Sequence, residues 1–256
     1  MKVTGEHMKL DNPWKNLDFW NSEDFVHSTD RDYVKDMANV ESKKRIILTA
    51  PPVPYIGNPK AMLVFLNLNP GYNIDKEYNE QQYYDRSDER NHEYLECYRK
   101  NLLHENYEYP FFCLDPKFEE GYGSSKKKDF PGYGWWNNRM EQLLGNEYDH
   151  KAVSRKIFCI EYFPYHSTSS PDFSRHIPTR EYNFQLLDEA IARKATIILM
   201  QGPQYWKKRL HDAHGAPYSY YRTIFRHNLT KDNLVFDDRR DALREIRKLL
   251  ENQGDV

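Results

Sequence analysis

Residues 62–72 constrain the fold of this chain most, because an apolar run ends there in a sequence that cannot continue as a strand. Residues 62–68 read MLVFLNL, and Asn69, Pro70 and Gly71 follow at once. A bounded apolar run of this length is typical of a strand buried on both faces. Proline lacks the amide hydrogen that a sheet needs, and glycine adopts backbone conformations that other residues avoid. We therefore predict that the strand ends here in a turn.

The polar residues around this turn have two interpretations. In open α/β sheets, ligands bind just beyond the carboxyl ends of the strands, and Asn67, Asn69 and Tyr72 would lie there. Asn, Pro and Gly are also the commonest residues of ordinary turns. These residues alone therefore leave open a ligand site and a turn that only ends its strand.

Other apolar runs predict further strands, and helical patterns separate them. The expected strands cover residues 45–49, 156–163, 195–200 and 218–225. The expected helices cover residues 93–104, 134–144, 179–191, 203–213 and 237–252, and residues 52–60 read as a proline-rich loop. This alternation predicts an α/β fold, a three-layer α/β/α sandwich with a four-stranded, mainly parallel sheet. Residues 1–44 are expected to form a helical N-terminal extension of an α/β domain over residues 45–256.

Composition argues against several classes of protein. The net charge of -2 gives no overall basic character, so binding to nucleic acid would need a local basic face. The 3 cysteines are widely spaced and match no disulfide framework or metal site; a reducing, cytoplasmic setting is the simplest expectation. No apolar run approaches the ~20 residues that cross a bilayer, and no signal peptide is apparent. We expect no metal, no other cofactor and no membrane partner; the sequence does not indicate an oligomeric state.

Three predicted strands end in polar turns, at residues 67–72, 163–167 and 201–203. If the strands are parallel, these turns meet at one edge of the sheet and enclose amides, hydroxyls, a histidine and aromatic rings. Amide side chains both donate and accept hydrogen bonds, so they suit the edge of a nucleobase, and aromatic rings stack on its face. The alternative is that each turn merely ends its own strand.

The order of these elements resembles the uracil-DNA glycosylase superfamily. The run Asn69-Pro70-Gly71 after a hydrophobic strand is similar to the first motif of its mismatch-specific branch. The second strand with its Phe-Pro-Tyr-His ending, and the strand that runs into Gln201-Gly202, are similar to the second and third core strands of the superfamily. The likeness covers roughly residues 60–235, and only its first motif is sharp.

The resemblance implies roles for individual residues. In the superfamily, the first motif positions a water molecule against the anomeric carbon of the sugar, and a donor from the last motif helps the base to leave. By position, Asn69 would hold the water, Tyr72 would pack near the base, and Phe163 would stack on it. His227 or Asn228 would supply the donor. The other residues expected to border the substrate are Asn67, Pro70, Gly71, His166 and Gln201.

Two features depart from the pattern of the superfamily. Its usual last motif, His-Pro-Ser or Asn-Pro-Ser, is absent, and residues 226–229 read Arg-His-Asn-Leu near the expected place. The cysteine ligands of the iron–sulfur branches are also absent. Because an asparagine cannot act as a general base, Asn69 would only orient water, and a slow enzyme is expected unless a carboxylate such as Asp75 or Glu77 assists.

The sequence thus predicts a uracil-DNA-glycosylase-like protein that hydrolyses the N-glycosidic bond of a damaged or modified base in DNA. The alternative is a non-catalytic nucleic-acid or nucleotide binder on the same fold. Either form of nucleic-acid binding requires positive charge gathered on one face. The expected contributors are Lys126, Lys127, Lys128, Lys207, Lys208, Arg209 and Arg226.

Overall fold

The structure is a computed structural model that describes residues 10–39, 45–73, 80–120, 130–169, 171–212, 221–223, 234–235 and 242–251. Its strands are β1 (Ile46–Ile47), β2 (Tyr55–Gly57), β3 (Leu63–Asn67), β4 (Ile157–Glu161), β5 (His166–Ser167), β6 (Thr196–Leu199), β7 (Tyr221–Thr223) and β8 (Leu234–Val235). Its α-helices are α1 (Arg31–Ala38), α2 (His92–Leu102), α3 (Tyr133–Leu144), α4 (His150–Lys156), α5 (Arg180–Ala192), α6 (Pro203–Asp212) and α7 (Ala242–Glu251). Short 3-10 helices are η1 (Pro13–Asn16), η2 (Glu80–Tyr84), η3 (Glu89–Asn91), η4 (Phe112–Leu114) and η5 (Pro116–Phe118).

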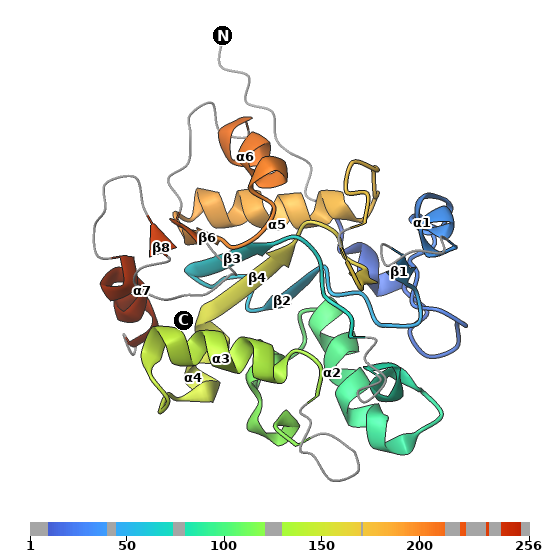
Figure 1. Ribbon diagram of the computed structural model, residues 1–256, viewed down its shortest axis with the longest axis horizontal. Helices are drawn as coiled ribbons and strands as arrows, with labels where there is room; N and C mark the ends of the chain where they lie inside the picture. Colours follow the sequence, from blue (N-terminus) through green and yellow to red (C-terminus); the bar gives the residue numbers. More distant parts are fainter. Residues whose placement is uncertain are drawn as a thin grey trace.

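The central element is a mixed sheet in the order β2-β4-β3-β6-β7-β8 (Figure 1). Strands β4, β3, β6 and β7 pair in parallel, whereas β2 and β8 pair antiparallel at the two edges. The four parallel strands match the runs predicted at residues 62–68, 156–163, 195–200 and 218–225. The chain is therefore an α/β protein, as its sequence indicates.

One sequence prediction about strands is confirmed and another is wrong. The strand expected over residues 45–49 is β1, which pairs antiparallel with β5 in a separate two-stranded sheet. The proline-rich loop predicted at residues 52–60 contains β2, which pairs with β4. Prolines precede this strand but do not enter it, and β2 needs a partner on one side only, since it lies at an edge of the sheet.

The pairing of β3 with β4 continues beyond the strands themselves. The register runs from Leu63 opposite Ile157 to Asn67 opposite Glu161. Past the strands, the amide of Phe163 donates to Leu68 O at 2.9 Å, and the amide of Ser167 donates to Pro70 O at 3.2 Å. An isolated parallel bridge then joins Gly71 to Ser167. The first polar turn is thereby held alongside the second one.

Helices lie on both sides of the sheet (Figure 1). Helix α5 packs on one side, where the Asn183 amide donates to Pro54 O at 3.0 Å and to Glu161 O at 2.8 Å. Helix α6 lies on the same side as α5. Helix α3 lies on the other side, and its Trp136 ring contacts the Phe65 ring of β3 at 5.6 Å. Gly145 ends α3 with a positive φ of 94°, as expected for a glycine that follows a helix.

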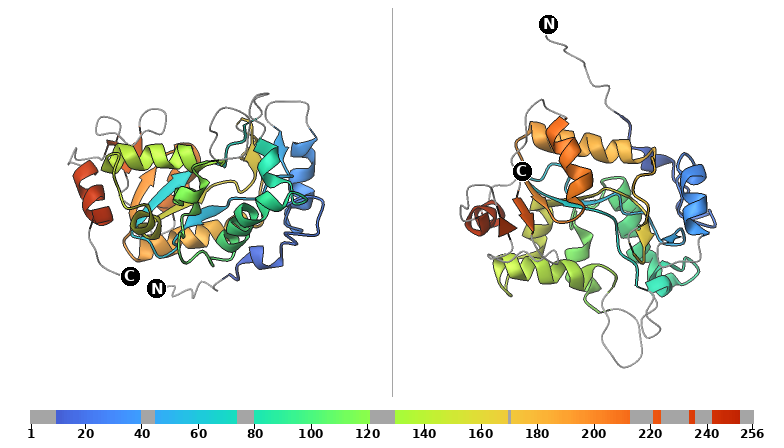
Figure 2. Two further views of the ribbon diagram at one scale, coloured as in Figure 1. Left: turned by 90° about the horizontal axis from the view of Figure 1, so that it is seen from below. Right: turned by 45° about the horizontal axis from the view of Figure 1, so that its top comes forward.

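The N-terminal segment is part of the core, although little of it is helical. Trp14 and Phe25 are each only 2% exposed, and Figure 2 places α1 at the end of the molecule opposite α7. The carboxylate of Asp30 is fully buried and accepts hydrogen bonds from Tyr165 Oη at 2.7 Å and Thr179 Oγ1 at 2.6 Å. These bonds join the N-terminal segment to the turn after β4 and to the start of α5.

The first helix begins later in the chain than the sequence indicates. Helix α1 starts at Arg31 rather than at residues 21–24, where the sequence shows a helix-start signal. There the Asp24 carboxylate accepts from the backbone of Val26 and from Arg31, so it is used in the turn before the helix. None of the helices in the described ranges has both the length and the apolar character needed to cross a membrane.

Candidate functional site

A cavity of about 820 Å³ lies at the carboxyl ends of β3, β4 and β6. Seven of the residues predicted to border a ligand line this cavity. They are Asn67, Asn69, Pro70, Gly71, Tyr72, His166 and Gln201. The convergence follows from the parallel order of the three strands, because each delivers the turn after it to the same edge.

Phe163 does not line this cavity, so the stacking role expected for it is wrong. Its side chain is 0% exposed and packs against the rings of Tyr165 and Phe173, each at 5.8 Å. Strand β4 ends at Glu161, and the chain bends before Pro164. The alternation of side chains along a strand therefore no longer decides which way Phe163 points.

His227 and Asn228, expected as the donors to the leaving base, lie outside the described residues, as do Asp75 and Glu77. The same holds for most of the expected basic face, namely Lys126, Lys127, Lys128, Arg226 and the side chain of Lys208. Lys207 is exposed. Arg209 forms an ion pair with Asp188.

The amide of Asn69 is held in one orientation at the cavity wall. Its Nδ2 donates to Ser167 Oγ at 2.7 Å and to Pro70 O at 2.9 Å. Ser167 Oγ in turn donates to Ser169 O. Both bonds use the nitrogen, and no group in the described ranges donates to Asn69 Oδ1. The side chain therefore presents a fixed acceptor oxygen at the end of β3.

His166 is a neutral support for the turn at residues 70–72. Its Nδ1 donates to Gly71 O at 2.7 Å, and its side chain is 4% exposed. Burial lowers the pKa of His166 to about 4, so the imidazole carries no charge at neutral pH. The Tyr72 ring stands edge-on to His166 at 6.3 Å, and its hydroxyl donates to Gln81 Oε1 at 3.0 Å.

Glu80 adds a carboxyl group that the sequence did not single out. It lines the cavity and is 5% exposed. Tyr84 Oη donates to its Oε1 at 2.6 Å, and the amide of Asn73 donates to its Oε2 at 2.7 Å. Burial raises the pKa of Glu80 to about 7, although both of these hydrogen bonds lower it. The group therefore changes charge near neutral pH.

Glu161 is the second such carboxyl group, at the end of β4 beside Asn67. Asn67 Nδ2 donates to Glu161 Oε1 at 3.2 Å. Burial raises the pKa of Glu161 to about 8, against smaller lowering effects from Asn67 and Cys159. The sequence carries a signal for it, because one acidic residue stands in the otherwise apolar run IFCIEYF at residues 157–163. A charged residue in a strand buried on both faces needs an explanation.

Aromatic rings also line the cavity. They come from α2, η4, the segment before α3 and α3 itself: Tyr98, Phe112, Phe130, Trp135 and Trp136. Trp136 is buried in the core, where its ring contacts the rings of Phe111 and Phe65. Trp135 is only partly buried, and the Arg139 guanidinium lies over its ring at 3.8 Å. Trp135 is thus a partly exposed aromatic residue of the cavity lining.

Comparisons with models of protein families, with curated proteins and with solved structures find no match. No cluster of three or more histidine, cysteine, aspartate or glutamate side chains suited to a metal ion occurs in the described segments.

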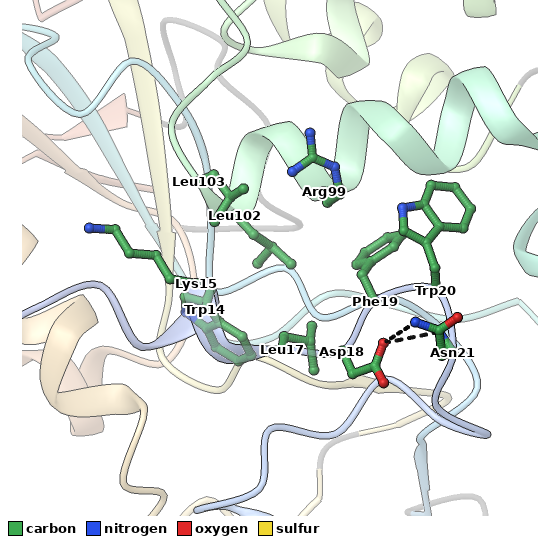
Figure 3. A pocket seen from close by; sticks show the side chains of 10 residues that line it. All are labelled: Trp14, Lys15, Leu17, Asp18, Phe19, Trp20, Asn21, Arg99, Leu102 and Leu103. Atoms are coloured by element: carbon green, nitrogen blue, oxygen red, sulfur yellow. Dashed lines mark hydrogen bonds between the residues drawn. The ribbon is translucent and has the colours of Figure 1, made fainter.

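Two other hollows occur in the described structure. One, of about 760 Å³, lies near the amino end of β4 and includes Lys60, Tyr107 and Arg155. A smaller one, of about 220 Å³, lies between the N-terminal segment and α2 (Figure 3). Three of its polar side chains pair with one another or with a neighbour: Asn21 donates to Asp18 at 3.1 Å, and Arg99 donates to Glu96 at 2.7 Å.

Proposed function

We propose that this chain binds a nucleobase in the cavity at the carboxyl ends of β3, β4 and β6, and hydrolyses the N-glycosidic bond of a damaged or modified base in DNA. The observation that carries the proposal is the meeting of Asn69, Asn67 and Gln201 with aromatic rings in one cavity of about 820 Å³. Flat neutral ligands need amides at their edges and rings on their faces, and this cavity offers both.

Asn69 would orient the attacking water. Its amide is fixed by Ser167 and Pro70, and its Oδ1 would accept a hydrogen bond from the water. The water oxygen forms a bond to the anomeric carbon, while the bond from that carbon to the base nitrogen breaks and the base leaves with the electron pair. An oriented water loses less entropy on reaching the transition state.

Glu80 would take the proton that the water releases. A general base works best when its pKa lies near the working pH, and burial raises the pKa of Glu80 to about 7. The hydrogen bonds from Tyr84 and Asn73 hold the carboxylate in place. Glu80 thus supplies the assisting carboxylate that an asparagine motif lacks.

The same proposal includes the relationship to the uracil-DNA glycosylase superfamily and a three-layer α/β/α sandwich. The Asn-Pro-Gly turn after β3 supports the first, and helices α5 and α3 on opposite sides of the sheet support the second. DNA is the proposed partner, and Arg139 beside Trp135 is a candidate phosphate contact. A non-catalytic nucleic-acid or nucleotide binder on the same fold is the second candidate, because Asn69 is no general base.

The test is a screen for base release. Single- and double-stranded oligonucleotides, each with one deaminated, alkylated or oxidised base, are incubated with the protein, and abasic sites are scored by alkaline cleavage. We expect release from at least one substrate and its loss in Asn69→Ala. Asn58→Ala, in the hollow near the amino end of β4, is the matched control and should keep activity. If no substrate yields abasic sites, the enzyme proposal fails; binding without release favours the second candidate.

A further inference from the structure

Asn67 and Glu161 form a pair on one face of the sheet. They are register partners at the ends of the parallel strands β3 and β4, so their side chains project from the same face. Phe65, two residues before Asn67, contacts Trp136 of α3, so this is the face that α3 covers. Both residues line the cavity, and each is 5% exposed.

The hydrogen bonds of the pair use one oxygen of Glu161 and leave two other polar atoms without a partner. Glu161 Oε1 accepts from Asn67 Nδ2 at 3.2 Å and from Cys159 Sγ at 3.8 Å. Asn67 Oδ1 and Glu161 Oε2 are buried and have no hydrogen-bond partner among the described residues. Buried polar atoms without partners are rare in folded proteins and call for an explanation such as a ligand.

The surroundings of Glu161 keep its carboxyl group protonated at neutral pH. The pKa of Glu161 is raised to about 8, mainly by burial. Among the described residues, the titratable groups around it supply no positive charge: Cys159 lies on its own strand, and Cys113 of η4, Glu80 of η2 and His166 of β5 line the cavity. Since Oε1 accepts two hydrogen bonds, the proton resides on Oε2.

We infer that Asn67 and Glu161 act together as a two-point recognition element for a planar ligand whose edge carries one hydrogen-bond donor beside one acceptor. Asn67 Oδ1 accepts from the donor of the ligand, and the Oε2 hydroxyl of Glu161 donates to its acceptor. This inference rests on the proposed function, since it concerns the base-binding cavity. The lactam edge of a nucleobase, a ring N–H next to a carbonyl, has this pattern.

The pair also makes the preference depend on the proton of Glu161. Once that proton is lost, the two residues present acceptors only, and the carbonyl of a lactam would face a carboxylate. A neutral glutamine at position 161 would keep both the accepting oxygen and the donor, without a group that titrates. The Glu161→Gln variant therefore mimics the protonated state of Glu161 closely.

The test uses 2′-deoxyinosine and 2′-deoxyuridine, with 1-methyl-2′-deoxyinosine and 3-methyl-2′-deoxyuridine as matched probes that lack the ring N–H. Binding is measured by calorimetry with the wild-type protein, Glu161→Gln and Glu161→Leu between pH 6 and pH 9. We expect methylation to weaken wild-type binding about tenfold or more. Wild-type binding should weaken about tenfold between pH 7 and pH 9, whereas Glu161→Gln should keep its affinity and Glu161→Leu should lose it at every pH.

Three results would overturn the inference: equal binding of the methylated and parent nucleosides, wild-type binding that is the same at pH 6 and pH 9, or equal losses in Glu161→Gln and Glu161→Leu with both variants folded by circular dichroism. Any pH dependence left in Glu161→Gln belongs to other groups, either Glu80 or the ring N–H of the nucleoside, which itself loses its proton in mildly alkaline solution. The proposed function fails separately. If binding shows the expected effects of methylation, pH and substitution but no base is released, the recognition by Asn67 and Glu161 is supported and the proposed hydrolysis is refuted.

Discussion

Replacement of Glu161 by glutamine should stabilise the protein, and increasingly so as the pH rises. The side chain is 5% exposed, and burial raises its pKa from 4.5 to about 8. Above pH 4.5 the unfolded chain releases this proton, whereas the folded chain keeps it up to about pH 8. The folded state therefore binds more protons in this window, and its stability falls as the pH rises.

The size of the effect follows from the two pKa values. Each unit of difference corresponds to about 1.4 kcal/mol, so a pKa of about 8 against 4.5 makes wild-type stability fall by about 4 kcal/mol between pH 5 and pH 9 from this group alone. Glutamine does not titrate, so the variant escapes this loss. Its amide still accepts at the oxygen that faces Asn67 and still donates at the other position.

Urea unfolding followed by tryptophan fluorescence measures the difference in the free energy of unfolding at pH 5, 7 and 9. The two proteins should be nearly equal at pH 5, and Glu161→Gln should be several kcal/mol more stable at pH 9. Glu119→Gln, a change at an exposed glutamate, is the control and should show no such trend. A difference between Glu161→Gln and wild type that is the same at all three pH values would refute the reasoning.

Three further predictions follow from single contacts. Asn69→Ala should lower base release about a hundredfold or more, whereas Asn69→Asp should keep or raise it, because a carboxylate orients water and stabilises positive charge on the sugar; both are read from abasic-site yield. Trp135→Ala should weaken binding to single-stranded DNA by about 1–3 kcal/mol in fluorescence anisotropy. Asp30→Ala should lower the free energy of unfolding by about 3 kcal/mol or more, since Tyr165 and Thr179 lose a shared acceptor.

Each of these has a clear contrary result. Full activity in Asn69→Ala would remove the water-orienting role while leaving the enzyme possible. A loss in Trp20→Ala as large as in Trp135→Ala would show that stacking is not confined to the cavity, since Trp20 lines the small hollow near α2. An unfolding midpoint for Asp30→Ala equal to that of the wild type would mean that its buried hydrogen bonds contribute no net stability.

The sequence predicted the parallel core of this fold because its strands are nearly continuous apolar runs with a polar stop. The turn at Asn69-Pro70-Gly71 and the start of α6 at Pro203 both follow from backbone rules for proline and glycine. The edge strand β2 was missed because its residues stand among prolines, and a three-residue strand at an edge needs no long apolar run. The helix-start signal at residues 21–24 lies before the actual start of α1 at Arg31, because Asp24 is used in the turn that precedes the helix.

The residues of the candidate site were predictable only where their position along a strand decides which way the side chain points. Asn67 lies at the end of β3, and its place at the cavity follows from strand order. Glu80 and Tyr98 reach the same cavity from η2 and α2, so tertiary packing alone brings them there. The prediction for Phe163 was wrong because this residue lies just past the end of β4, where the alternation of side chains no longer decides their direction. Glu161 was visible as one acid in an apolar strand, and its meaning depended on its partner Asn67.

The most direct test of the central claim is to find where a bound base lies. A single-stranded oligonucleotide that carries one 5-iodouracil is irradiated with the protein, and the cross-linked peptides are identified by mass spectrometry. Aromatic side chains next to the base should react, so we expect cross-links to Tyr72, Phe112 or Trp135 at the cavity beyond β3 and β4. Cross-links confined to Tyr107 or Trp20, which line the other two hollows, would contradict it.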